Sequence, residues 1–325
     1  LIAANNEKIS GSIDNGLDYI FGENSDRNVT IFIDDFNSKV FFPKFSIFSV
    51  KGPIELTFLP IEDGNDTIIR SYAMLTNADV YIPSLALKKM KGIYGKLKFA
   101  FTKDNKSSFE YLQNDVLVSG NAIHKSIFEV NQVDYSSIKT PDIRIRKATF
   151  QKFGAYNQFK TSKGTITLDF LLRRSFNKKK IPLDLIFSDI VVISDSNILL
   201  DSIRGEIRSF QGLRGYAKAT LSSNSNLEVI ISPHEENGIN LIFSGNNAGE
   251  LLRRGDYYRN GYGGIFKASI FYKNKNQIEG SLEIEDFRVK NAPVLAQIIS
   301  SASIIGVLDN LNGNGLFFTK IEGTF

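Results

Sequence analysis

The segment QIEGSLEIEDFRV, residues 277–289, alternates polar and apolar side chains, and APVLAQIISSASIIG, residues 292–306, follows it. Because successive side chains of a β-strand point to opposite faces, the first segment predicts a strand with one apolar face. In the second segment the apolar residues fall on one helical stripe. We therefore predict a strand, a short apolar helix over about residues 292–308, and a return to strand near residue 316. The stripe of this helix consists of Leu295, Ile298, Ile299, Ala302 and Ile305.

The same period of two recurs upstream of this segment. Clear examples are residues 54–58 (IELTF), 96–102 (KLKFAFT), 165–170 (TITLDF), 227–231 (LEVII) and 239–243 (INLIF). Short polar turns separate these runs, and each run has one apolar and one wet face, which is typical of antiparallel sheets. The sequence therefore predicts a mainly β protein built on an elongated antiparallel sheet.

Only short helices are expected besides the C-terminal one. Residues 247–254 predict one, capped by Asn246 or Asn247, and residues 10–21 predict another. A soft boundary near residues 160–164 divides the chain into an N-terminal part, 1–163, and a C-terminal part, 164–325.

Composition excludes several classes of chemistry. The 325 residues include no cysteine, so a disulfide framework, a thiolate metal site and a cysteine nucleophile are all excluded. The two histidines, His124 and His234, lack metal-ligand spacing, and the glycine-rich stretches lack the Lys-Ser/Thr of a phosphate-binding loop. We predict neither an enzyme nor a bound metal or cofactor.

The charge pattern points to no strong polyanion partner. The net charge is +4, and basic residues are not interleaved with stacking aromatics along one face, so no nucleic-acid partner is predicted. Arg259 beside Tyr257 and Tyr258 is the single hint of such a pattern. Basic clusters such as Arg253-Arg254 are explained by solvated turns, or alternatively by attraction to anionic lipid head groups.

The alternating strands fit two architectures. In a β-sandwich, the apolar face of each sheet packs against a second sheet. In a curled sheet, the apolar faces line an open trough instead. The residue pattern by itself leaves both architectures open.

The C-terminal part resembles a known family from about residue 195 onwards. It is similar to the C-terminal region of the AsmA-like family of Gram-negative envelope proteins, of the YhdP and TamB type. The residues that carry the resemblance are 247–252 (NAGELL), Gly263-Gly264, 286–289 (DFRV), 292–296 (APVLA), 301–306 (SASIIG) and 308–315 (LDNLNGNG).

This resemblance implies a sheet that curls into a hydrophobic groove and a role in bridge-like transport of phospholipid between the inner and outer membranes. The implied partners are phospholipid acyl chains, and both membranes through parts largely outside this chain. The implied location is the periplasm, with an anchor in the inner membrane upstream. The predicted lipid-groove residues are Ile166, Leu168, Phe170, Val229, Ile231, Leu241, Phe243, Phe266, Ile270, Leu282 and Ile284.

Two alternatives stand beside lipid transport. The chain is alternatively a scaffold or assembly factor for outer-membrane proteins, which would template strands through exposed sheet edges. A third alternative is a secreted β-sandwich binding module or a carbohydrate enzyme. The predicted helix over residues 292–308 has two readings as well: it plugs the end of the groove, or it docks on a membrane or partner. It has too few apolar residues, and too many serines, to cross a bilayer.

Overall fold

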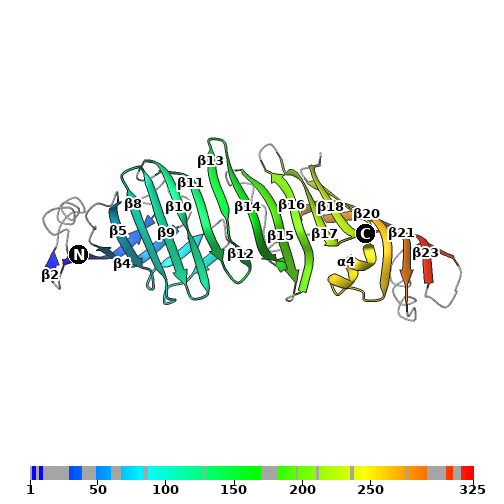
Figure 1. Ribbon diagram of the computed structural model, residues 1–325, viewed down its shortest axis with the longest axis horizontal. Helices are drawn as coiled ribbons and strands as arrows, with labels where there is room; N and C mark the ends of the chain where they lie inside the picture. Colours follow the sequence, from blue (N-terminus) through cyan, green and yellow to red (C-terminus); the bar gives the residue numbers. More distant parts are fainter. Residues whose placement is uncertain are drawn as a thin grey trace. The chain divides into compact units, whose positions relative to one another are not determined.

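The structure is a computed structural model. In it the chain forms two compact units. The first unit is Leu1–Lys152 and the second unit is Phe153–Phe325. The structure describes residues 2–4, 7–9, 29–38, 49–59, 67–82, 87–126, 129–169, 182–194, 197–209, 212–234, 238–274, 277–290, 305–309 and 316–325. Each unit consists mainly of β-strands (Figure 1).

The first unit is an antiparallel sheet in which β4 bends between two partners. The first half of β4 pairs with β6, and the second half pairs with β5, which continues through β8, β9, β10 and β11. The strands are β1 (Ile2–Ala4), β2 (Glu7–Ile9), β3 (Val29–Asn37), β4 (Ser49–Leu59), β5 (Thr67–Met74), β6 (Asp79–Ile82), β7 (Leu87–Lys89), β8 (Lys96–Thr102), β9 (Lys106–Gln113), β10 (Val116–Ser126), β11 (Glu129–Lys139), β12 (Ile143–Ile145) and β13 (Ala148–Phe153).

The second unit is a meander in which each strand from β15 to β21 pairs with the next along the chain, and β21 then pairs with β23. One helix, α4 (Ala248–Arg254), lies between β19 and β20. The strands are β14 (Tyr156–Thr167), β15 (Leu183–Ser194), β16 (Asn197–Arg208), β17 (Arg214–Ser222), β18 (Ser225–Pro233), β19 (Ile239–Gly245), β20 (Gly261–Asn274), β21 (Gln277–Val289), β22 (Ile305–Asp309) and β23 (Leu316–Thr324).

The predicted fold class is confirmed, with one departure in strand direction. β14 and β15 pair in parallel, with Ile166 opposite Val192. The two compact units divide between residues 152 and 153, and β14 runs without a break through the boundary expected at residues 163–164. The short helix predicted over residues 247–254 is confirmed as α4, with Asn247 as its N-cap. The helix predicted over residues 10–21 lies outside the described residues.

The C-terminal end of the predicted helix over residues 292–308 is wrong. Residues 305–308 belong to strand β22, and Ile305 pairs with Glu322 of β23. The β-branched Ile305 and Val307 favour strand, and Gly306 is unfavourable within a helix, and these preferences outweigh the apolar stripe. The other residues of that stripe, Leu295, Ile298, Ile299 and Ala302, lie outside the described residues.

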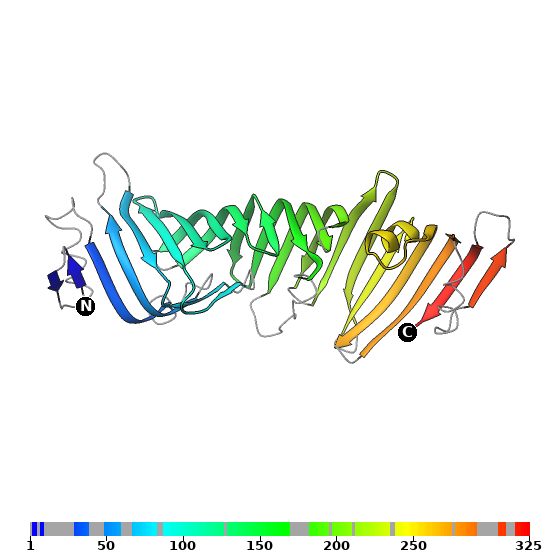
Figure 2. The ribbon, with the colours of Figure 1, turned by 90° about the horizontal axis from the view of Figure 1, so that it is seen from below.

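The sheet of the second unit is curved. Helix α4 contacts β16, β20 and β21, although β17, β18 and β19 lie between β16 and β20 in the pairing order. Neighbouring strands are about 4.8 Å apart, so a flat sheet would separate β16 from β20 by about 19 Å. A seven-residue helix is only about 10 Å long. The sheet therefore curls around α4, which Figure 2 shows in yellow within the second unit.

Candidate functional site

One face of the second unit is apolar across consecutive strands. Val229 of β18 lies opposite Phe243 of β19, which lies opposite Ala268 of β20 and then Leu282 of β21. Cross-strand partners share a face of the sheet, so these side chains form one continuous row. A parallel row passes through Ile231, Leu241, Ile270 and Gly280. We call the face that carries both rows the apolar face.

The opposite face of the same strands carries ion pairs beside a row of Tyr216, Ile230 and Ile242, in which Tyr216 and Ile230 are about half exposed. Lys218 Nζ lies 2.8 Å from Glu228 Oε1, and Lys320 Nζ lies 2.7 Å from Glu283 Oε1 and 2.6 Å from Glu322 Oε1. These pairs are exposed, and such pairs contribute little to stability. The two faces therefore differ in that ion pairs lie on this face, whereas the two rows of the apolar face contain no charged side chain.

Helix α4 closes one end of the apolar face. Leu251 and Leu252 of α4 pack against a cluster in which Leu227, Phe266 and Ile284 are buried. This cluster extends to β15 and β16 through the buried residues Ile190, Val192, Leu199 and Ile203. Within the described residues, α4 therefore closes one end of the apolar face.

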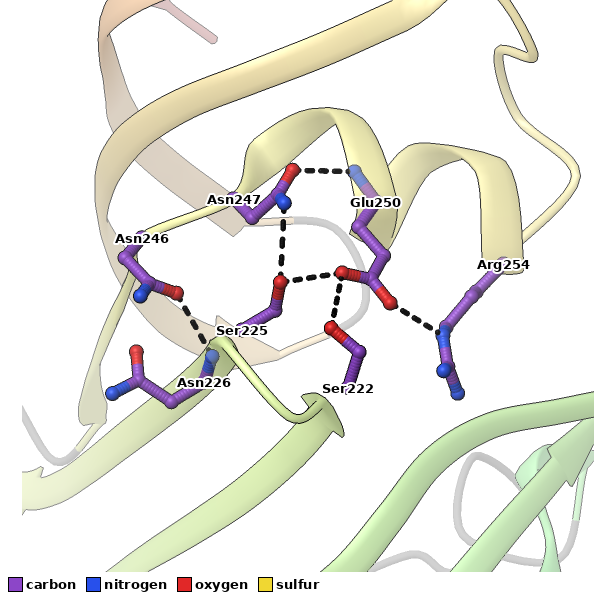
Figure 3. Close-up of polar contacts among 7 residues, drawn as sticks. All are labelled: Ser222, Ser225, Asn226, Asn246, Asn247, Glu250 and Arg254. Carbon is purple, nitrogen blue, oxygen red and sulfur yellow. Dashed lines mark hydrogen bonds and ion pairs between the residues drawn. The ribbon is translucent and has the colours of Figure 1, made fainter.

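A polar clamp fixes α4 to the turn between β17 and β18 (Figure 3). Asn247 caps the helix by accepting a hydrogen bond from the Glu250 backbone N–H at 2.9 Å, and its side-chain N–H donates to Ser225 Oγ at 3.1 Å. The Glu250 carboxylate accepts from Ser222 Oγ at 2.9 Å and from Ser225 Oγ, and it pairs with Arg254 Nε at 3.2 Å. Figure 3 also shows Asn246 accepting from the backbone N–H of Asn226. The clamp holds the helix on the sheet by contacts that are distant in sequence.

The clamp keeps Glu250 ionised. Burial by itself raises the pKa of this carboxyl, but the hydrogen bonds from Ser225 and Ser222 together with the ion pair to Arg254 outweigh that effect. The net result is a pKa below the ordinary value for glutamate. The ionised form of Glu250 is thus more stable in the folded protein than in the unfolded chain.

We expect the contribution of Glu250 to stability to depend on pH. It is fully present above the ordinary glutamate pKa and is lost as the pH falls through the lower pKa of the folded state. Glu250→Gln should reduce the free energy of unfolding by about 1–3 kcal/mol at neutral pH. Urea unfolding of both proteins between about pH 3 and pH 7 should show this difference shrinking towards the acid end. A difference that stays constant down to about pH 3 would contradict the assignment of the clamp.

The other end of the apolar face is less covered by the described residues. Ile231, Leu241 and Ile270 are only partly covered and do not belong to the cluster beneath α4. Gly280 continues their row without a side chain, and a Cβ placed there would lie 2.4 Å from the ring of Phe325. The Phe325 side chain therefore lies beside the row, and it is 61% exposed. The face thus runs from a closed end under α4 to an end lined by partly exposed apolar side chains.

The structure divides the predicted lipid-groove residues among three environments. Phe266 and Ile284 are buried beneath α4. The partly exposed row contains Ile231, Leu241 and Ile270. Phe170 lies outside the described residues. The remaining predicted residues are partly buried and pack against the α4 cluster: Ile166, Leu168, Val229, Phe243 and Leu282.

Sequence reasoning missed the part of this face on β15 and β16. Phe187 and Gly205 are cross-strand partners, as are Leu185 and Ile207, and they extend the two rows beyond β17. Residues 190–193 (IVVI) are apolar on both faces, so the period of two gives no indication of which side faces inwards. The cross-strand register was needed to assign them.

The first unit also has an apolar face, but the hairpin of β6 and β7 covers it. Val80 and Ile82 of the hairpin lie over Phe109 and Tyr135 of the sheet, enclosing an apolar cavity of about 30 Å³. Lys89 of the hairpin is fully buried, and its Nζ donates to the Ala78 carbonyl oxygen at 2.7 Å. Desolvation lowers the pKa of Lys89. The hairpin therefore packs on this part of the sheet in the first unit.

The described residues offer little for covalent chemistry or metal binding. They contain no group of three or more His, Asp or Glu side chains placed to hold a metal ion. His124 is buried with its Nε2 at 2.6 Å from Ser107 Oγ, and burial lowers its pKa. His234 packs on Phe271 with ring centres 4.0 Å apart. Within the described part of the chain, no helix is long and apolar enough to cross a membrane.

Comparison with known proteins identifies no relative. No protein-family model, curated protein or solved structure matches the chain.

Proposed function

We propose that the second unit binds phospholipid acyl chains on its apolar face and shields them from water during bridge-like transport between two membranes. The observation that carries the proposal is the partly exposed row of Ile231, Leu241 and Ile270, which lies on a curved sheet and contains no charged side chain. The resemblance to AsmA-like envelope proteins supports the same role. On this proposal the protein acts in the periplasm, where an aqueous gap separates the two membranes.

Exposing an acyl chain to water carries a large free-energy cost. Each CH₂ group exposed to water costs about 0.8 kcal/mol, so a sixteen-carbon chain costs roughly 12 kcal/mol. A continuous apolar wall removes most of this cost, while the lipid head group stays in water at the open side. Soluble proteins rarely expose a large contiguous apolar surface, so such a surface indicates a binding site.

The composition of the face favours sliding rather than fixed binding. Its rows contain Val, Ile, Leu, Phe, Ala and Gly, which offer dispersion contacts without a directional hydrogen bond. A polar anchor would hold a lipid in one place and slow its movement. The face therefore fits transport better than storage of one tightly bound ligand.

Site-specific photocrosslinking should locate the lipid. We expect a photoreactive amino acid at position 270, in the partly exposed row, to form an adduct with radiolabelled phospholipid in cells. Ser269 is the matched control, because it is adjacent in sequence, exposed and on the opposite face, paired with Ile242 and Ser281. Adducts of equal yield at positions 269 and 270, or none at position 270, would argue against the groove.

An assembly factor for outer-membrane proteins is the second candidate. Among the pairings that the structure describes, β22 is hydrogen-bonded on one side, to β23, which leaves an edge suited to strand addition. Such a factor would bind strand peptides without requiring lipid. Peptide binding by a chain that lacks any lipid adduct at position 270 would favour this candidate.

A further inference from the structure

A row of cations and aromatic rings crosses the second unit beside the end that α4 closes. Tyr262 of β20 is the cross-strand partner of Arg288 of β21, which in turn is opposite Phe317 of β23. The guanidinium carbon of Arg253 and the ammonium nitrogen of Lys290 each lie 4.8 Å from the centre of the Tyr262 ring. We call these five residues the basic–aromatic patch.

The patch points away from the core of the unit. Phe287 and Val289, which flank Arg288 in β21, are buried, so the alternation of the strand turns Arg288 outwards. Tyr262 is 38% exposed, and the nearby Tyr257 is 74% exposed. Large aromatic side chains are therefore presented to the surroundings together with cations.

The positive charge of the patch is not neutralised locally. Its neighbours Arg254 and Arg259 form ion pairs with Glu250 and Asp256, so these two carboxylates do not neutralise the patch. Among the described residues, Arg253, Arg288 and Lys290 make no ion pair with a carboxylate. Even with the exposed Asp286 counted against these three, the patch keeps a positive excess.

We propose that the basic–aromatic patch docks the second unit on an anionic phospholipid bilayer. Tyrosine favours the membrane–water interface, because its ring is apolar and its hydroxyl group stays hydrated. Lysine and arginine are attracted to the negative surface of such a bilayer. The cation–aromatic contacts hold the two kinds of group together on one surface. This inference goes beyond the proposed function, because docking does not require a lipid on the apolar face.

Co-sedimentation with vesicles tests the docking surface. The chain should bind vesicles of phosphatidylcholine containing phosphatidylglycerol, bind phosphatidylcholine alone much more weakly, and dissociate at high salt. Each basic residue near such a surface contributes about fivefold in affinity, so Arg288→Gln combined with Lys290→Gln should weaken binding about 25-fold. The matched control combines Lys218→Gln with Lys267→Gln, which removes the same charge from exposed positions elsewhere on the unit. The control should bind within about twofold of the parent chain.

Several results would overturn the inference. They are equal loss of binding in both double variants, binding that high salt does not weaken, and the absence of vesicle binding by the parent chain. Binding of a single-stranded oligonucleotide as tight as that of the anionic vesicles would instead assign the patch to nucleic acid. Thermal unfolding followed by circular dichroism confirms that both variants fold. Lipid carried on the apolar face is measured separately after purification, so failure of docking and failure of the proposed function are distinguishable.

Discussion

Replacement of Ile270 by aspartate is expected to remove phospholipid from the purified chain without unfolding it. Ile270 lies in the partly exposed row between Leu241 and Gly280, outside the cluster beneath α4. A carboxylate there stays hydrated in the empty groove, so folding is largely preserved. An acyl chain laid over it would desolvate the charge at a cost of several kcal/mol. Bound phospholipid per chain should therefore fall at least about tenfold, as measured by quantitative mass spectrometry of lipid extracts.

The control for this experiment is the neighbouring position on the other face. Ser269→Asp adds the same charge to an exposed residue that pairs with Ile242 and Ser281. It should leave the lipid content unchanged. Equal loss of lipid in both variants would attribute the effect to net charge rather than to the apolar face. Unchanged lipid in Ile270→Asp would place any bound lipid elsewhere.

Truncation of Phe266 should produce the largest loss of stability. Its side chain is 6% exposed and lies in the cluster beneath α4. A Cβ on Gly245 would lie only 2.5 Å from the Phe266 ring, so the ring occupies the space that this glycine leaves open. In Phe266→Ala the backbone of the neighbouring strand cannot easily move into the cavity that the ring leaves. The substitution should therefore lower the free energy of unfolding by about 3–5 kcal/mol.

Urea unfolding measures this cost, with Ile265→Ala as the matched control. Ile265 is adjacent in β20, points to the opposite face and is 56% exposed, so its truncation should change stability by less than about 0.5 kcal/mol. The slope of the unfolding free energy against urea should be similar in all three proteins. A loss for Ile265→Ala as large as that for Phe266→Ala would contradict the assignment of the two faces.

The alternation of the C-terminal strands was sufficient to predict much of the fold. Residues 227–231 and 239–243 were predicted as antiparallel strands, and β18 and β19 pair in the register that places Val229 opposite Phe243. Local rules also predicted α4 and limited its cap to Asn246 or Asn247, of which the structure has Asn247, because a capping asparagine leaves a signature within a few residues. In both cases the information is local in the sequence.

The features that sequence analysis missed depend on contacts between distant residues. Ser222 and Glu250 are 28 positions apart, and the register of β18 with β19, with Leu227 opposite Gly245, brings the β17–β18 turn beside the start of the helix. The run of Ile305 to Leu308 shows a different difficulty. Its apolar residues fit a helical stripe, but pairing with β23 and the preference of β-branched residues for strands make it β22. The parallel pairing of β14 with β15 likewise has no local signal.

The most direct test of the lipid groove is the lipid content of the chain itself. The chain should be expressed in a Gram-negative host, purified without detergent, and extracted for mass spectrometry alongside a soluble control protein. Our account predicts several phospholipid molecules per chain, with acyl chains that protect the apolar face from water. A well-folded, monomeric chain that carries no more phospholipid than the control protein would contradict it.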